Sequence, residues 1–491
     1  MGLIQQQTIK GTVYSFLGVI IGFVNIAVLS PMIFTTDQIG LTQVMVAMAT
    51  IIAQLGNLGF NNVAARLFPL FRSSRKGHNG YLSLAFLVTG AGFIICLVAL
   101  SLYMPVFVEN NREKSMLLAQ YAEYLPILVG IIMLFTLLDY YSKVLFNAVL
   151  GTFLREFVMR LVLLGLILSF YFGIIDFSDY VFLFIVAQAI PALGITIYLL
   201  IKGEFKFTGF REFITPSLKK QMLSLCAFGI LSGLSGIAIT SIDKYMVNAY
   251  VGLSGAGIYS IAVYFASLIL IPARSLQKIA IPVISEAWKR NDNEVIQNVY
   301  YKSSINQLII GLLIFIGIIA NMNNIFRILP PEYAEGELVI IFFGLTNLMR
   351  VSAGASMIVI STSSRYRYMT YLMVIQILLV ITSNILLIPA LGITGAAVAS
   401  FITMFVYIWL NIILIKRFFG LWPFGKNHLV IIALSSVICV AGYLIPEMSL
   451  VIDIIIRSIF ITVLFAASLL LFNISEDVNN LYRDLRRYLK L

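Results

Sequence analysis

Long apolar runs separated by short polar stretches make up most of this chain. An apolar run of roughly 20 residues is long enough to cross the hydrocarbon core of a bilayer as a helix. About fourteen such runs are present, and each is predicted to form one transmembrane helix. They lie near residues 11–32, 41–65, 81–104, 117–148, 153–173, 180–201, 221–247, 255–285, 302–322, 338–361, 369–388, 393–415, 428–446 and 451–473. The pattern predicts an all-α, polytopic membrane protein.

The composition agrees with this prediction and excludes several other classes of protein. Of 491 residues, 60% are hydrophobic and only 11% are charged, whereas a soluble domain carries about a quarter charged residues. A soluble enzyme, a disordered chain and a disulfide-rich secreted module are therefore excluded. The chain has three cysteines, all in apolar runs, and two histidines, both in polar connections. This spacing suits neither a metal site nor a nucleophile, and no ATP-binding motif is present. We predict no catalytic residue, no metal and no cofactor.

The basic residues orient the predicted helices. If the N-terminus is cytoplasmic, about 23 of the 33 Lys and Arg residues fall in inner segments, and outer segments hold only Arg112, Lys114 and Arg327. This bias predicts that both termini are cytoplasmic. The formal charge of +11 thus mainly reflects the basic residues that orient the helices. We predict that the protein contacts membrane lipids and does not bind nucleic acid.

The connections suggest an organisation in two halves. We predict an N-terminal lobe over 1–201, a cytoplasmic linker over 202–220, a C-terminal lobe over 221–416, two further helices over 427–473 and a cytoplasmic amphipathic tail over 474–491. Ser475 is predicted to cap the tail helix, whose basic face suits an anionic membrane surface. The two lobes echo each other weakly, because Gly40 and Gly257 coincide when the halves are offset by 217 residues.

Several short patterns, taken in order, resemble one family. They are Ile9–Thr12, Asn25, Asp37–Leu41, Leu58–Phe60, Ala64–Arg66, Ile242–Met246, Gly257–Ser260, Pro272 and Leu391–Ser400. With the helix count, they resemble the Wzx-type lipid-linked polysaccharide flippases, which move O-antigen and capsule precursors. These flippases belong to the multidrug/oligosaccharidyl-lipid/polysaccharide exporter (MOP) superfamily.

The resemblance implies a fold and an activity. The fold would be two six-helix lobes in a V, with helices 1, 2, 7 and 8 around a cavity and helices 13 and 14 appended. The activity would be translocation of an undecaprenyl-pyrophosphate-linked oligosaccharide by alternating access, for lipopolysaccharide or other surface polysaccharide. Other proteins of surface-polysaccharide assembly would then be partners. The alternatives are a cation-coupled drug or metabolite antiporter of the same superfamily and a membrane enzyme, but the outer loops are too short for the enzyme.

Charged residues inside the predicted spans are the candidate functional residues. Each costs about 2.5–3.5 kcal/mol at mid-bilayer, so its presence calls for a structural or functional explanation. Seven are basic, namely Lys143, Arg160, Lys244, Arg274, Lys278, Arg350 and Arg457. Lys143, Arg160 and Arg457 lie near span ends, where snorkelling explains them, as it explains much of Lys278. Asp139 and Lys143 are also one turn apart and are predicted to pair.

The remaining bases have two interpretations. Arg350 is predicted to be buried near the midplane, Arg274 follows the helix-breaking Pro272, and Lys244 adjoins Asp243. Interhelical salt bridges, with Asp243 or Asp139 as charge partners, would explain them structurally. A cationic cavity for a pyrophosphate would explain them functionally.

The bases outnumber the intramembrane acids, and this surplus favours the cavity. The predicted substrate-binding residues are Arg350, Arg274, Lys278, Lys244 and, at the cytoplasmic portal, Arg66. The other interpretation of Arg66 is an ordinary positive-inside residue.

Overall fold

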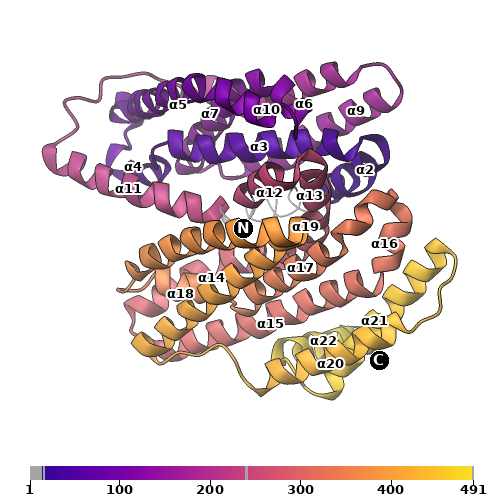
Figure 1. Ribbon diagram of the computed structural model, residues 1–491. Coiled ribbons are helices and arrows are strands. Elements are labelled where there is room, and N and C mark those ends of the chain that lie inside the picture. The colour runs from indigo at the N-terminus through magenta and orange to yellow at the C-terminus, as the bar shows by residue number, and fades with distance from the viewer. Residues whose placement is uncertain (1–13, 15–16, 238–240, 489–491) are drawn as a thin grey trace. The chain divides into compact units, whose positions relative to one another are not determined.

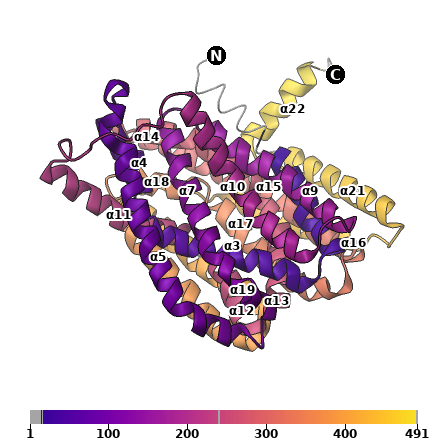
Figure 2. The ribbon, with the colours of Figure 1, turned by 90° about the horizontal axis from the view of Figure 1, so that it is seen from above.

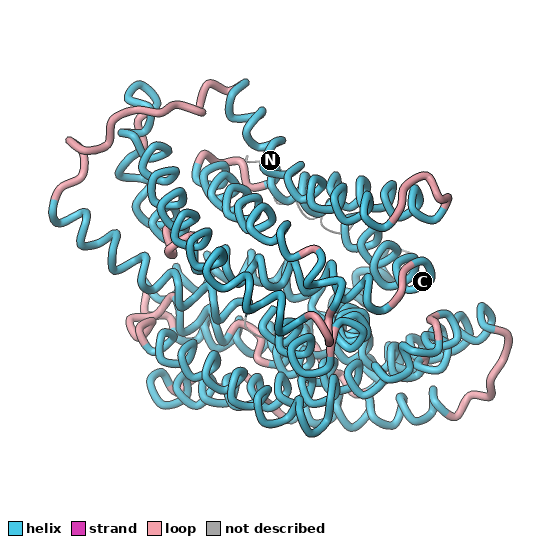
Figure 3. The backbone as a smooth tube through the Cα atoms, turned by 45° about the horizontal axis from the view of Figure 1, so that its top comes forward, coloured by secondary structure: helices cyan, strands magenta, loops and turns pink. Residues whose placement is uncertain are grey.

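The computed structural model describes residue 14 and residues 17–237 and 241–488 (Figure 1). Its contacts divide the chain into two compact units, Met1–Ser260 and Ile261–Leu491. Throughout the described residues the regular structure is helical, with no strand (Figure 3). The predicted all-α class is confirmed.

The first unit is built from helices that are broken at several points. In chain order they are η1 (Val24–Leu29), α2 (Ser30–Ile33), α3 (Thr36–Gly56), α4 (Asn61–Phe71), η2 (Ser74–Gly80), α5 (Tyr81–Asn111), α6 (Met116–Gln120), η3 (Ala122–Tyr124), α7 (Leu125–Val144), α8 (Val149–Thr152), η4 (Phe153–Val158), α9 (Met159–Tyr171), α10 (Phe177–Ile201), α11 (Pro216–Ile237) and α12 (Asp243–Val251). Helix α13 (Leu253–Ser267) begins in this unit and ends in the next. A core rich in aromatic rings, among them Phe68, Phe71, Tyr81 and Tyr141, holds α4, α5 and α7 together.

The second unit continues with η6 (Leu268–Leu270), α14 (Ile271–Lys289), α15 (Asn293–Ala320), α16 (Met322–Ile328), η7 (Pro331–Gly336), α17 (Glu337–Ser352), α18 (Ser356–Ser361), α19 (Tyr368–Phe419), α20 (Lys426–Tyr443), α21 (Leu450–Leu471) and α22 (Glu476–Tyr488). Its apolar core joins α15 to α17, α20 and α21. Helix α22 follows α21 and turns away from its axis (Figure 2).

The breaks explain how these helices correspond to the predicted spans. Among the described residues, 10 helices are long and apolar enough to cross a membrane, and Leu17–Ile33 is a shorter apolar helix. Helix α19 has 52 residues with a non-helical backbone at Gly392, where φ is 59°, so it supplies two predicted spans. The second predicted span is divided between α3 and α4 at Leu58 and Gly59, both with positive φ. With the broken spans joined, the count of about fourteen agrees with the structure.

In each unit, one contact near the helix ends joins two segments that are predicted to be cytoplasmic. In the first unit, His78 Nε2 lies 2.9 Å from Glu204 Oε2, which joins two segments predicted to be cytoplasmic. In the second unit, Lys302 Nζ lies 3.0 Å from Glu476 Oε2 at the start of α22. Each of these two contacts therefore joins segments that the charge pattern assigns to the same side of the membrane. The amphipathic tail is helical over Glu476–Tyr488, and residues 489–491 lie outside the described part.

The predicted internal echo corresponds to a reciprocal contact within the first unit. A Cβ atom on Gly40 of α3 would lie 2.0 Å from the Leu253 carbonyl oxygen of α13, and a Cβ atom on Gly257 would lie 2.1 Å from the Thr36 carbonyl oxygen. Positions 36 and 253, like positions 40 and 257, are separated by the same 217 residues. The starts of α3 and α13 therefore pack on each other in equivalent ways, and only glycine allows so close an approach.

Candidate functional site

Among the intramembrane bases whose side chains the structure describes, three form ion pairs with carboxylates one helical turn away. Lys143 Nζ lies 2.5 Å from Asp139 Oδ2, which confirms the predicted pair. Arg160 pairs with Glu156 at 2.6 Å and Arg457 with Asp453 at 2.9 Å.

Snorkelling is therefore the wrong explanation for Arg457. Its side chain is only 5% exposed, and it is neutralised inside the protein rather than at the headgroups. The Arg160 guanidinium is likewise partly buried and paired, at 20% exposure. Internal pairing lowers the cost of these charges without help from the headgroup region.

Lys244 has a different environment from these three. Its Nζ donates to Gln43 Oε1 of α3 at 2.7 Å, so its contact is a neutral amide. The neighbouring Asp243 is fully buried and accepts a hydrogen bond from the Tyr259 hydroxyl at 3.0 Å. The two side chains thus engage different helices, as adjacent positions on one helix should. The positive charge of Lys244 remains in the first unit beside a polar pocket.

The other predicted site residues are distributed more widely. Arg350 lies in the last turn of α17, just before the break at Ala353–Ala355, and its side chain is exposed. The prediction that it is buried is wrong, because the helix ends there and opens the surface around it. Arg66 of α4 is exposed, with its guanidinium 6.0 Å from the centre of the Phe228 ring. Arg274 and Lys278 belong to α14, but their side chains lie outside the described residues.

A polar pocket of about 340 Å³ lies within the first unit beside Gln43. Two π-helical segments, η1 and η4, both contribute to its wall, and π-bulges are frequent at functional sites. Its polar lining residues are Asn25, Ser30, Gln38, Thr42, Gln43, Arg155, Glu156, Arg160, Tyr180 and Gln188. The pocket thus presents amides, hydroxyls, two guanidinium groups and a carboxylate within one lobe.

Helix packing fixes the charged wall of this pocket. A Cβ atom on Gly18 would lie 2.2 Å from the Glu156 carbonyl oxygen, so the first helix crosses η4 at very short range. Arg160 donates to the Gly18 carbonyl, and Asn25 Nδ2 donates to the Arg160 carbonyl at 2.8 Å. Asn25 is 3% exposed, and its Oδ1 has no hydrogen-bond partner within the described part of the chain. A buried acceptor left in this state suits a ligand that brings a hydroxyl or an amine.

Most of these pocket residues escaped the sequence analysis. Gln43 and Gln188 are uncharged and were not considered, and Gln38 entered only as part of the pattern Asp37–Leu41. Arg155 was counted only as an inner positive charge. The sequence does contain a signal for this pocket, because glutamine is rare in apolar spans and the pocket lining includes three glutamines. No group of three or more His, Cys, Asp or Glu side chains suited to a metal ion occurs among the described residues.

The apolar helices, the apolar surface and the embedded charges define a multi-pass membrane protein. The chain matches the family model described as polysaccharide biosynthesis protein over residues 6–288, more than half of its length. It belongs to that family. No curated relative matches the chain in sequence.

Solved structures share the fold. The structure of "Lipid II flippase MurJ, inward closed conformation" is 16% identical, aligns over 97% of this chain and 99% of its own, and has a TM-score of 0.75. An inward-facing multidrug resistance MATE transporter of the MOP superfamily is 15% identical over 83% of this chain and 95% of its own, with a TM-score of 0.57. A variant of the Vibrio cholerae MATE transporter VcmN also scores 0.57, at 14% identity over 84% of this chain and 96% of its own. The chain therefore has the fold of MOP-superfamily transporters.

Proposed function

We propose that this protein flips an undecaprenyl-pyrophosphate-linked oligosaccharide from the inner to the outer leaflet of the bacterial cytoplasmic membrane. The product would supply the synthesis of a surface polysaccharide. Membership of a polysaccharide biosynthesis family supports this proposal, and so does the fold shared with a lipid II flippase. Alternating access of the two lobes would carry the sugar across while the polyprenyl chain stays in lipid.

The observation that carries the proposal is the position of Lys244. Three intramembrane bases have a carboxylate one turn away, whereas Lys244 contacts an amide that also lines the polar pocket. A lysine held in this way keeps its positive charge for an anionic ligand, and a pyrophosphate is a dense anion. Arg350, which is exposed, is the second predicted contact.

The polar pocket in the first unit supports an oligosaccharide as the neutral part of the cargo. Glutamine and asparagine amides donate and accept hydrogen bonds at once, as sugar hydroxyls do. The side-chain Oδ1 of Asn25, which lacks a partner among the described residues, would accept from one such hydroxyl. At about 340 Å³, the pocket is near the lower end of the range for small-molecule sites.

Transport in proteoliposomes tests the proposal. A fluorescently labelled lipid-linked oligosaccharide is placed in one leaflet, and its arrival in the other is followed by its accessibility to a membrane-impermeant quencher. Lys244→Ala and Arg350→Ala should each reduce flipping at least tenfold while folded protein stays near normal. Arg350→Lys should recover part of the rate, because the charge survives but the bidentate fork is lost.

Lys143→Ala is the matched control, because it removes an intramembrane base that already has its own carboxylate. It should lower the amount of folded protein more than the rate per folded molecule. Equal transport by wild-type and Lys244→Ala protein would overturn the assignment of Lys244. No flipping by wild-type protein, together with ion-driven export of a small organic cation, would overturn the proposed function.

Ion-driven export of a small organic cation would identify a cation-coupled drug or metabolite antiporter. The buried Asp243 carboxylate is the observation that favours it, since a buried acid suits a coupling ion. The likeness to the MATE transporters fits as well, with lower TM-scores than the flippase.

A further inference from the structure

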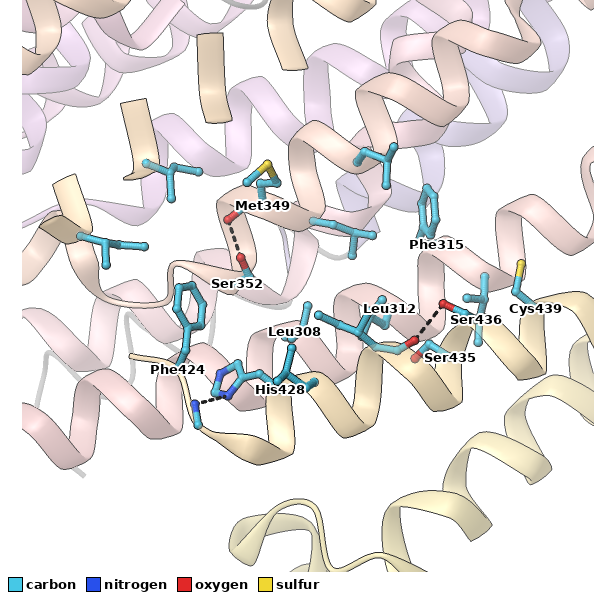
Figure 4. Close-up of a pocket in the computed structure, with 18 of the residues that line it drawn as sticks. Leu308, Leu312, Phe315, Met349, Ser352, Phe424, His428, Ser435, Ser436 and Cys439 are labelled. Carbon is cyan, nitrogen blue, oxygen red and sulfur yellow. Dashed lines mark hydrogen bonds between the residues drawn. The ribbon is translucent and has the colours of Figure 1, made fainter. Parts of the chain in front are cut away.

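A second, mainly apolar cavity of about 810 Å³ lies inside the second unit (Figure 4). It is enclosed by α15, α17, α19 and α20, and its walls are chiefly leucine, isoleucine and aromatic side chains, with Leu308, Leu312 and Phe315 prominent among them. Leu429, Ile432 and Val440 of α20 line it and are also exposed. The cavity therefore opens along α20, where the exposed surface is apolar.

Most polar side chains in this cavity are satisfied by the protein. The hydroxyl groups of Ser352 and Ser436 donate to carbonyls of their own helices, Met349 at 2.8 Å and Ile432 at 2.9 Å. The His428 ring accepts from the Gly425 N–H at 3.1 Å and contacts the Ser304 hydroxyl at 2.9 Å.

Two polar groups in the lining are left without a partner. Ser435 is 2% exposed, and neither its hydroxyl nor the indole N–H of Trp409 is hydrogen-bonded to any described residue. Both can donate, and a donor buried in an apolar wall costs about 1–3 kcal/mol when unpaired. A ligand with acceptor oxygens at these positions would remove that cost.

One end of the cavity has the character of a membrane interface. The rings of Trp409, Trp422 and Phe424 cluster with centroids 5.6–6.3 Å apart. Lys416 Nζ lies 4.7 Å from the centre of the Trp422 ring, and Gln297 fixes the loop by two hydrogen bonds to the Trp422 backbone. Aromatic rings and a lysine at the end of an apolar cavity are typical of headgroup level.

We propose that this cavity binds one anionic glycerophospholipid of the membrane. Its acyl chains would fill the apolar part, its ester carbonyls would accept from the Trp409 indole and the Ser435 hydroxyl, and its phosphate would lie near Lys416. A polyprenyl chain is the less suitable occupant, because it has no acceptor along its length and would leave both donors unpaired. The bound lipid would fasten α20 to α15, α17 and α19, which is a role separate from the proposed transport.

The three tryptophans of the chain make this proposal testable by fluorescence. Trp409 and Trp422 line the cavity, while Trp288 donates to the Val359 carbonyl elsewhere in the unit. In detergent-purified Trp288→Phe protein, phosphatidylglycerol brominated on its acyl chains should quench the emission saturably, at about one lipid per protein. Brominated phosphatidylcholine should bind several-fold more weakly.

Variants of adjacent basic residues separate specific binding from general adsorption. Lys416→Gln should weaken phosphatidylglycerol binding about fivefold, the effect expected of one basic residue near an anionic headgroup. Arg417→Gln is the matched control, because the next residue on the helix points about 100° away. Quenching that does not saturate, or that the two variants reduce equally, would overturn the proposal.

A second measurement does not depend on variants at the headgroup end. Cys439 lines the cavity, so in a Cys96→Ala/Cys226→Ala background it is the only thiol. Bound phosphatidylglycerol should slow its reaction with a maleimide, and undecaprenyl phosphate should not. Stronger protection by undecaprenyl phosphate would instead assign the cavity to a polyprenyl chain and refute the phospholipid.

Discussion

Replacing Arg457 by methionine is expected to destabilise the second unit by about 3–5 kcal/mol, the cost of breaking a buried ion pair. The guanidinium donates twice to the Asp453 carboxylate, at 2.9 and 3.2 Å. It also donates to the carbonyls of Gly442 and Ile445 at the end of α20, at 2.7 and 3.0 Å. Methionine fills a similar volume but makes none of these bonds. It leaves two helix-end carbonyls without this donor, and it leaves the buried Asp453, which is 1% exposed, with the Asn324 amide as its remaining donor among the described residues.

Variants of Asp453, alone and combined with Arg457→Met, extend this free-energy difference to a double-mutant cycle. Asp453→Asn should cost less, about 1.5–3 kcal/mol, because the amide still accepts and the carbonyls still hold the arginine. Arg457→Met combined with Asp453→Leu should recover much of the loss, since neither buried charge then remains. The exposed pair of Arg290 and Glu286, at the same spacing, is the control, and Arg290→Met should cost at most about 1 kcal/mol.

Reversible unfolding in mixed micelles, with increasing sodium dodecyl sulfate, gives these free energies. The fraction of folded protein is followed by tryptophan emission, and each variant is compared with wild-type protein at the same detergent ratio. The reasoning is refuted if Arg457→Met costs no more than Arg290→Met, or if the double variant is as unstable as Arg457→Met alone. Either result would mean that Arg457 is solvated at the headgroups, as its place near a span end first suggested.

Two further predictions concern topology and helix packing. A reporter fused after Leu491 and one inserted in Lys202–Lys220 should both read as cytoplasmic, and one inserted in Asn323–Glu337 should read as external; an external C-terminus would show that the last two spans are miscounted. Gly257→Ala should sharply reduce folded protein in a membrane-abundance assay, because its Cβ would lie 2.1 Å from a backbone carbonyl. Gly90→Ala, with nothing within 4 Å of its Cβ, should be neutral or slightly stabilising, and equal effects of the two substitutions would argue against the close contact.

The class of the protein and its helices are determined by the sequence alone. Apolar length decides whether a segment crosses a bilayer, and the placement of Lys and Arg biases its direction, so both can be read locally. The pairing of Asp139 with Lys143 was predictable for the same reason, because it lies within one helical turn. The same spacing joins Glu156 to Arg160 and Asp453 to Arg457, but their position near span ends suggested snorkelling instead.

The environment of each remaining polar group was decided by tertiary structure. The contact of Lys244 with Gln43 joins residues 201 positions apart, and no helical period links such positions. The exposure of Arg350 depends on where α17 ends, and the polar pocket depends on two π-helical segments that hydropathy does not distinguish from ordinary helix. Apolar and polar content specifies which segments enter the membrane, but the side chains that meet there are fixed by packing between helices distant in sequence.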